Sequence, residues 1–257
     1  MILAILKETR PGERRVAVVP ETAAQLVRAG LAVRVQAGAG AGAFFDDEAY
    51  RQAGAEVVAD AAAACRDAGL VVKIAAPSDE EIALLPAGSA LVAVLNPLTA
   101  RELVAKLAAA KVTALALDAI PRIARAQSMD VLSSMSTIAG YKAVLLGADA
   151  MGRMCPMLMT AAGTLRPASA LVVGAGVAGL TAIATAKRLG AVVTAVDVRP
   201  AAKEQVESLG ARFVPMDVSH EAEAAGGYAA DLGEEYYRRE QEVLAPHVKG
   251  SDLVVTT

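Results

Sequence analysis

Short apolar runs alternate with helix-like segments along almost the whole chain, and this alternation restricts the fold more than any other feature of the sequence. Strands that are apolar throughout and separated by helices form parallel sheets with both faces covered. The first half therefore predicts a parallel α/β domain. Its expected strands are Ile2–Leu6, Ala32–Gln36, Leu70–Ala75, Ala90–Leu95 and Thr113–Leu117. Its expected helices are Glu21–Ala29, Asp47–Ala53, Asp60–Ala68 and Ala100–Ala110.

The start of the helix Ala100–Ala110 carries a specific signature. Thr99 is a suitable N-cap residue, and Glu102, three residues later, completes the pattern of a capping box. The sequence therefore predicts that this helix begins directly after Thr99.

The alternation resumes in the second half, after a long helix that Ser133 or Ser134 is expected to cap. Its expected strands are Ala170–Val173, Val192–Asp197, Arg212–Val214 and Asp252–Thr256. We predict two Rossmann-like, doubly wound parallel-sheet domains separated by a cleft, residues 1–132 and 133–257. A doubly wound nucleotide-binding domain has about six strands, so the second domain is expected to be incomplete at its C-terminus.

Composition excludes several classes of protein. The 257 residues carry 25 Lys and Arg against 28 Asp and Glu, a net charge of −3, which gives no electrostatic case for nucleic acid. The two cysteines, Cys65 and Cys155, form neither a disulfide framework nor a zinc-binding pattern, and no metal site is predicted. The uncharged stretch Pro167–Ala186 has the length of a membrane span, but its glycines indicate a buried strand, turn and helix. No membrane span is expected.

The glycine-rich segment of that stretch matches the dinucleotide-binding pattern G-x-G-x-x-G. Gly174 permits a tight turn, Gly176 lets the backbone approach a pyrophosphate, and Gly179 lets helix and strand pack closely. Val177, which lies inside the motif, is also expected to contact the cofactor. The segment follows an expected strand and opens an expected helix, which is the context that the motif requires.

An acidic residue, Asp197, ends the next expected strand. A carboxylate at this position accepts hydrogen bonds from the adenosine ribose and repels a 2′-phosphate, which favours NAD(H) over NADP(H). Arg199 complicates this prediction, because a nearby arginine can accommodate that phosphate.

A residue for proton transfer is hard to find. The only two histidines, His220 and His247, lie late in the chain, away from the expected strand ends of the first half. Lys73 is a credible charged group at such a strand end, and Arg14 and Arg15 could hold a carboxylate. Asn96, by contrast, cannot exchange a proton near neutral pH.

The most informative polar segment is residues 122–134, Arg-Ile-Ala-Arg-Ala-Gln-Ser-Met-Asp-Val-Leu-Ser-Ser. One interpretation is a polar loop that Ser133 caps and an Arg122–Asp130 ion pair stabilises. However, this string, followed by Ile-Ala-Gly-Tyr at 138–141, closely resembles the signature loop of the NAD(H)-binding component of proton-translocating nicotinamide nucleotide transhydrogenases. The opening residues 7–17 and the segment 172–197 resemble the wider family that these proteins share with alanine dehydrogenases.

The resemblance implies roles for individual residues. Gln127 would reach toward the nicotinamide of a partner, and Arg122 and Asp130 would hold the carboxamide and the loop, with Ser133 nearby. Tyr228 would lie in the family's mobile loop that closes over NAD(H).

The two branches of the family differ in their proton chemistry. Alanine dehydrogenases are similar through Lys73 but carry a catalytic histidine where this chain has Asn96-Pro97. Transhydrogenation passes a hydride directly between two nicotinamides and needs no protein acid or base at that step. The absence of a well-placed histidine therefore favours the transhydrogenase branch.

The predicted function is that of the NAD(H)-binding component, which gives a hydride to NADP⁺ on a separate NADP(H)-binding domain. The resemblance also implies a membrane-spanning partner that couples the reaction to proton translocation, a homodimer, and a place on the cytoplasmic face of the inner (plasma) membrane. Two alternatives stay open: an alanine dehydrogenase-like enzyme that uses Lys73 and Arg15, and a non-catalytic NAD(H) sensor.

Overall fold

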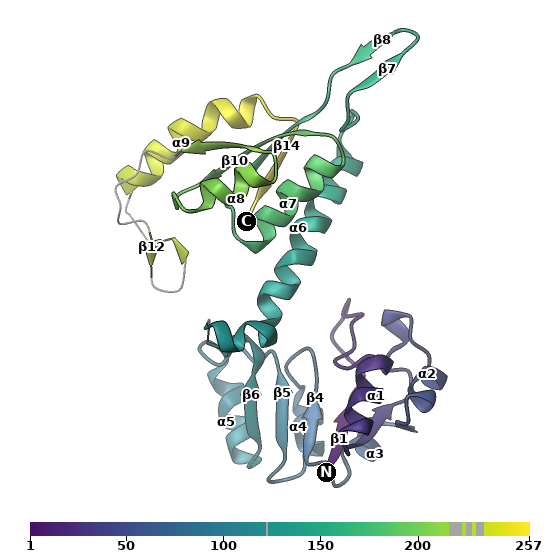
Figure 1. Cartoon of the computed structure of the whole chain (residues 1–257). Helices are drawn as coiled ribbons and strands as arrows, with labels where there is room; N and C mark the ends of the chain where they lie inside the picture. Colours follow the sequence, from purple (N-terminus) through teal and green to yellow (C-terminus); the bar gives the residue numbers. More distant parts are fainter. Residues whose placement is uncertain (122, 216–222, 225–227, 230–233) are drawn as a thin grey trace. The chain divides into compact units, whose positions relative to one another are not determined.

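The chain forms two compact units, Met1–Asp130 and Val131–Thr257 (Figure 1). The computed structural model describes residues 1–121, 123–215, 223–224, 228–229 and 234–257. Each unit is built on its own parallel sheet, which confirms the predicted α/β class with Rossmann-like parallel sheets.

The first unit contains a six-stranded sheet in the order β3-β2-β1-β4-β5-β6. This is the doubly wound order, in which the chain reverses its direction of travel across the sheet after β3. The central strand β1 pairs in parallel with β2 and with β4. The strands are β1 (Ile2–Ile5), β2 (Ala32–Gln36), β3 (Glu56–Val58), β4 (Leu70–Val72), β5 (Ala90–Ala93) and β6 (Thr113–Ala116).

Both faces of this sheet are covered by apolar side chains. Along β1, Leu3 and Ile5 belong to one buried cluster, whereas Ala4 and the following Leu6 belong to another. Because successive side chains of a strand point to opposite faces, the two clusters lie on opposite sides of the sheet. The continuous apolar pattern of the strand is the consequence of this double burial.

The first unit shows the predicted alternation of strands and helices. It also contains the helix α4 and the strand β3, which the sequence did not predict. The α-helices are α1 (Pro20–Arg28), α2 (Asp47–Gln52), α3 (Ala61–Cys65), α4 (Asp79–Leu84) and α5 (Arg101–Ala109). Three short 3₁₀ helices complete the unit: η1 (Ala41–Ala43), η2 (Leu117–Ala119) and η3 (Ala124–Met129).

The capping box predicted at Thr99 is wrong. Ala100 is the N-cap of α5 and no side chain caps it, because the Asn96 carbonyl accepts the N–H groups of both Thr99 and Ala100 and holds the segment in a turn. A capping box is present at α4 instead, where the Ser78 hydroxyl accepts from the amide of Glu81 and the Glu81 carboxylate accepts from the amide of Ser78.

The second unit contains a four-stranded parallel sheet in the order β11-β10-β9-β14. Its strands are β9 (Ser169–Val173), β10 (Val192–Asp197), β11 (Arg212–Pro215) and β14 (Leu253–Thr256). Its helices are α6 (Val131–Ala150), α7 (Val177–Arg188), α8 (Ala202–Ser208) and α9 (Glu234–Lys249). Two small antiparallel hairpins are β7 (Leu158–Thr160) with β8 (Gly163–Leu165), and β12 (Glu223–Ala224) with β13 (Tyr228–Ala229).

The long helix α6 begins at Val131, so the prediction that Ser133 or Ser134 caps it is wrong. Both serines lie inside the first turn. Among the described residues, α6 is the one helix with the length and composition to cross a bilayer, criteria that a core helix of a water-soluble protein also meets.

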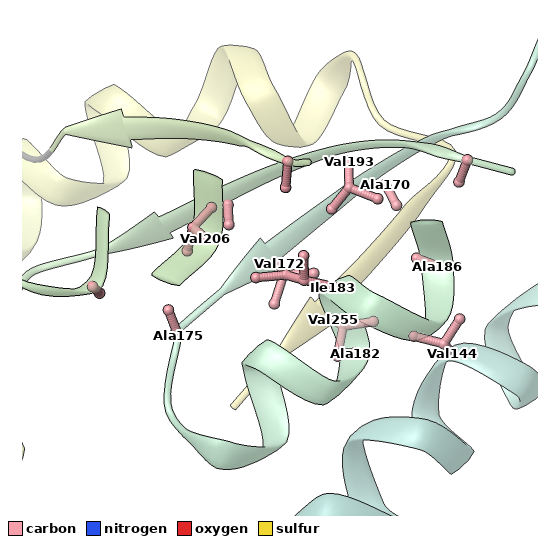
Figure 2. Packing of buried hydrophobic residues seen from close by; sticks show 14 residues of the cluster. Val144, Ala170, Val172, Ala175, Ala182, Ile183, Ala186, Val193, Val206 and Val255 are labelled. Carbon is pink, nitrogen blue, oxygen red and sulfur yellow. The ribbon is translucent and has the colours of Figure 1, made fainter. Parts of the chain in front are cut away.

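The core of the second unit is built from small aliphatic side chains between the sheet and the helices α6, α7 and α8. Val172, Val193 and Val255 of the sheet belong to one buried cluster with Ile183 of α7 and Val144 of α6 (Figure 2). Small side chains allow the helices to approach closely, which is the structural counterpart of the low aromatic content of 3%.

A close approach in this core joins Gly140 of α6 to the backbone of α7. A Cβ atom at Gly140 would overlap the carbonyl oxygen of Ala178, and a backbone atom cannot move aside as a flexible side chain can. We expect Gly140→Ala to destabilise the second unit by about 1–3 kcal/mol through overpacking. Gly152→Ala is the matched control, because a Cβ atom there meets nothing within 4 Å. Urea unfolding followed by circular dichroism measures the difference, and equal stabilities of the two variants would contradict the packing described.

Candidate dinucleotide site

The carboxyl end of β9 turns sharply at Gly174. This residue has a φ of +94°, a conformation that side chains with a Cβ rarely adopt. Its N–H donates to the carbonyl of Val196 on β10 at 2.8 Å, which fixes the turn to the neighbouring strand. The predicted role of Gly174 as the residue that permits the turn therefore has a direct structural cause.

The other two glycines of the motif differ in their surroundings. A Cβ atom at Gly179 would overlap the carbonyl oxygen of Gly174, so this glycine permits the close contact between α7 and the turn. A Cβ atom at Gly176 would meet nothing within 4 Å, so space is open in front of the backbone at this point. That open space lies where the motif requires a pyrophosphate to approach.

The N-terminus of α7 supplies hydrogen-bond donors beside this open space. Leu180 is the first residue whose amide has an acceptor in the helical pattern, the carbonyl of Gly176 at 2.8 Å. The amides ahead of it, including that of the half-exposed Val177, have no acceptor within the helix. Such donors, together with the positive end of the helix dipole, favour a phosphate group.

Asp197 ends β10 and lies beside the turn. Its carboxylate accepts from the amide of Ala175 at 2.7 Å, from the amide of Arg199 at 2.8 Å, and from the Arg199 guanidinium at 2.9 and 3.0 Å. Burial alone would raise the pKa of Asp197, but the hydrogen bonds from Arg199 and Ala175 outweigh it and lower the pKa below its ordinary value. The side chain is therefore ionised at neutral pH, as a ribose-binding carboxylate must be.

The residues predicted to surround the nicotinamide come from the segment before α6 and from the first turn of that helix. Gln127 lies in η3 and its side chain is exposed, whereas Asp130 and Ser133 are half-buried. The amide of Asp130 donates to the carbonyl of Gln127 at 3.3 Å, and the carbonyl of Ser133 accepts from the Thr137 hydroxyl. Arg122 lies outside the described residues, so its predicted roles stay predictions.

Tyr228 begins β13, which pairs in antiparallel fashion with β12. The residues on either side of these two short strands, 216–222, 225–227 and 230–233, lie outside the described portion of the chain. The prediction that Tyr228 belongs to a loop closing over the cofactor is not tested by the strand pairing.

A second polar cluster lies at the carboxyl end of the first sheet, and it contains Lys73. The ammonium group is 1% exposed and lies 2.5 Å from Glu81 Oε1 and 3.7 Å from Glu8 Oε2. The Glu8 carboxylate also accepts from the backbone amides of Ile74 and Ala75. Lys73 is thus buried and enclosed by two carboxylates of its own unit.

Sequence reasoning missed both glutamates of this cluster. A signal for Glu81 was available, because the spacing of Ser78 and Glu81 is itself a capping-box pattern. The carboxylate of Glu81 therefore contacts both the helix start and the lysine. No local pattern indicates Glu8, which is distant from Lys73 in the sequence.

Arg15 is paired as well. Its guanidinium contacts the Glu13 carboxylate through Nη2 at 2.6 Å and Nε at 2.8 Å, and these hydrogen bonds lower the pKa of Glu13 to about 2. Asn96, after β5, has a φ of +49°, and its backbone N–H donates to the Asp118 carboxylate at 2.8 Å. Lys73 and Arg15, the two cations that the alternative amino-acid dehydrogenase would use, are thus each paired with a glutamate of the first unit, Lys73 in a buried site and Arg15 at the surface.

A glycine turn between a parallel strand and a helix, with a carboxylate at the end of the next strand, defines a dinucleotide-binding α/β protein. The chain belongs to the alanine dehydrogenase/PNT family: the model of the family's N-terminal domain matches residues 4–139, and that of its C-terminal domain matches residues 143–257.

Curated relatives cover both branches of this family. An NAD(P) transhydrogenase alpha subunit of Rhodospirillum rubrum is 50% identical over all of this chain and 69% of its own length. The NAD(P) transhydrogenase alpha subunit of Haemophilus influenzae is 43% identical over all of this chain and 50% of its own length. Alanine dehydrogenase of Bacillus subtilis is 32% identical over 90% of this chain and 61% of its own length.

Solved structures show the same order of similarity. A transhydrogenase from Sinorhizobium meliloti superposes with a TM-score of 0.87 at 44% identity, over all of this chain and 69% of that one. An L-alanine dehydrogenase superposes with a TM-score of 0.75 at 31% identity, over 84% of this chain and 61% of that one. The family resemblance inferred from the sequence is confirmed.

The burial of Lys73 between two carboxylates predicts a structural role. We expect Lys73→Met to destabilise the first unit by about 3–5 kcal/mol, because it leaves two buried carboxylates without their cation. Lys106→Met is the matched control, since it removes an exposed ion pair with Asp79 and should change stability little. Urea unfolding of both variants measures the difference. A stable Lys73→Met protein would show that the lysine is not needed to neutralise the cluster.

Proposed function

We propose that the chain is the NAD(H)-binding component of a proton-translocating transhydrogenase, which gives a hydride from NADH to NADP⁺ held by a separate domain. The observation that carries this proposal is the combination of two features in one chain. The dinucleotide site of the second unit is built as the motif requires, whereas Lys73 and Arg15, the cations that would handle an amino acid, are paired with glutamates.

The relatives support the same branch. The transhydrogenase subunits match the entire chain at 43–50% identity, while the Bacillus subtilis alanine dehydrogenase matches 90% of it at 32%. The chain spans 50–69% of the length of these transhydrogenase subunits. We therefore propose the transhydrogenase activity for the complete protein to which this chain would belong.

The chain's own residues bind and orient the cofactor. The open backbone at Gly176 and the amides at the start of α7 receive the pyrophosphate, and Asp197 receives the adenosine ribose. The dihydronicotinamide supplies the hydride when NADH is bound. No residue of the chain has to donate or accept a proton at that step, in keeping with Asn96 at the position of the alanine dehydrogenase histidine.

The segment before α6 would present the nicotinamide to the partner. We assign Gln127 to the side facing the second nicotinamide, because its side chain is exposed on η3. Arg122, Asp130 and Ser133 would hold the carboxamide and the segment itself, and Tyr228 would close over the bound cofactor. These four assignments rest on the family resemblance.

The complete enzyme would contain an NADP(H)-binding domain and a membrane-spanning subunit in addition to this chain. The chain would bind peripherally on the cytoplasmic face of the inner (plasma) membrane. Proton movement would be coupled to the NADP(H) side.

Mixing experiments test the function. With the NADP(H)-binding domain of a transhydrogenase added, we expect hydride transfer from NADH to thionicotinamide-NADP⁺, followed by absorbance. With L-alanine and NAD⁺, we expect no NADH to form. Alanine-dependent NADH formation would overturn the proposal, and NADH binding without transfer to any partner domain would identify a sensor.

The role of Gln127 predicts a selective effect. We expect Gln127→Asn to slow hydride transfer at least tenfold, because a shortened side chain no longer reaches the partner's nicotinamide, while the Kd for NADH changes less than twofold. Ser128→Ala, an exposed neighbour in η3, is the matched control and should retain wild-type transfer. Stopped-flow transfer rates and fluorescence titration of NADH measure the two quantities. Unchanged transfer in Gln127→Asn would refute the assignment.

A homodimer belongs to the proposal, and the hairpin β7–β8 supports it. This hairpin projects from the body of the second unit (Figure 1). It carries the exposed side chains of Met157, Met159 and Leu165. An isolated two-stranded hairpin is marginally stable in water, and thioethers suit an adaptable contact surface. A second copy of the chain is the occupant that we assign to this surface.

The dimer proposal predicts the effect of a charge on the hairpin. Met159 is 84% exposed within the chain, so Met159→Lys should leave the fold intact and convert the dimer to a monomer. Val104→Lys on α5 adds the same charge at another exposed apolar position and is the control. Size-exclusion chromatography with light scattering gives the masses. An unchanged dimer in Met159→Lys would place the interface elsewhere.

A further inference from the structure

The hydrogen bonds around Asp197 leave no acceptor position for a ligand. An ionised carboxylate has two oxygens with about four lone-pair positions. Four donors already occupy them: Oδ1 accepts from N and Nε of Arg199, and Oδ2 accepts from N of Ala175 and Nη2 of Arg199. A ribose diol can therefore bind to this carboxylate only if an existing donor withdraws.

The guanidinium of Arg199 is the donor that can withdraw. The amides of Ala175 and Arg199 belong to the backbone of the glycine turn and of the segment after β10, so they are fixed by the fold. The guanidinium stands on a flexible side chain that is 24% exposed, whereas the Asp197 side chain is 6% exposed. The guanidinium donates to Asp197 through two groups, Nε and Nη2. The 2′- and 3′-hydroxyls of a ribose could donate to the carboxylate in their place.

We propose that Arg199 is a specificity-determining residue: its guanidinium takes the place of the ribose diol on Asp197 and is displaced when NAD(H) binds. This inference rests on the proposed function, because it assumes that NAD(H) occupies the glycine turn.

Two consequences of opposite sign follow for the two nicotinamide cofactors. For NADH, Arg199 is a competitor, because its hydrogen bonds to Asp197 must be broken before the diol can form its own. For NADPH, Arg199 is a partner, because the 2′-phosphate only accepts hydrogen bonds and is repelled by Asp197, and a guanidinium at this position offsets the repulsion. Removing the guanidinium should therefore tighten NADH and weaken NADPH.

A general loss of positive charge near the cofactor would act differently. It would weaken both nucleotides, since both carry phosphates. Lys203 of α8 provides the control for this effect, because it is a nearby cation that pairs with Glu207 at 4.0 Å and does not contact Asp197.

The test compares Arg199→Met with Lys203→Met by calorimetric titration with NADH and NADPH. Relative to Lys203→Met, we expect Arg199→Met to bind NADH about fivefold more tightly and NADPH about fivefold more weakly. Opposite shifts are a result that a purely structural role of Arg199 would not produce, because loss of local order weakens both nucleotides.

A second variant guards against a failure to fold. If Arg199→Met shows no cooperative thermal transition, Arg199→Lys carries the test, because an ammonium group cannot span both carboxylate oxygens but keeps the charge. We expect it to tighten NADH about twofold relative to the unchanged chain.

Two results overturn the inference separately from the proposed function. In the first, the unchanged chain binds NADH, but the folded Arg199 variant binds both nucleotides with the same affinity as Lys203→Met or more weakly. Arg199 then does not compete with the ribose. If the unchanged chain binds no NADH, the proposed function fails and the inference fails with it.

Discussion

The buried carboxylate of Asp197 joins the glycine turn after β9 to the carboxyl end of β10, and the candidate site depends on this contact. The turn needs a positive φ at Gly174, and the buried N–H of Ala175 that follows it needs a fixed partner. Asp197 is that partner, and its ionisation is maintained by hydrogen bonds against the opposing effect of burial. In the proposed function, the group that orders the turn would also receive the ribose, so one side chain would serve both folding and recognition.

The two sheets place their polar groups at equivalent edges but use them differently. At the carboxyl edge of the second sheet, the backbone at Gly176 faces open space and the first amides of α7 have no helical acceptor. At the carboxyl edge of the first sheet, Lys73 is buried between carboxylates and Arg15 is held by Glu13. Removing a buried cation from between two carboxylates would leave buried charges without a partner.

This difference between the two edges is consistent with the proposed function. An amino-acid dehydrogenase must move a proton and hold a carboxylate beside the nicotinamide. A chain that only presents NADH to a second nicotinamide needs a well-built dinucleotide turn and an accessible segment such as the one that carries Gln127. The pairing of Lys73 and Arg15 with glutamates accords with a chain of this second kind. The greater similarity to the transhydrogenase subunits points the same way.

The sequence by itself determined the α/β class, the parallel strands and the glycine turn with Asp197, because each follows from a local pattern: doubly buried strands are apolar throughout, and a sharp turn needs glycine. Local patterns did not determine the start of α6 or the position of the capping box, since several residues with suitable side chains compete for a helix end. Only the tertiary structure decided that Glu8 and Glu81 enclose Lys73 and that Arg199 saturates Asp197. Such pairings depend on which side chains the fold brings within hydrogen-bond distance, and spacing along the chain does not encode that distance.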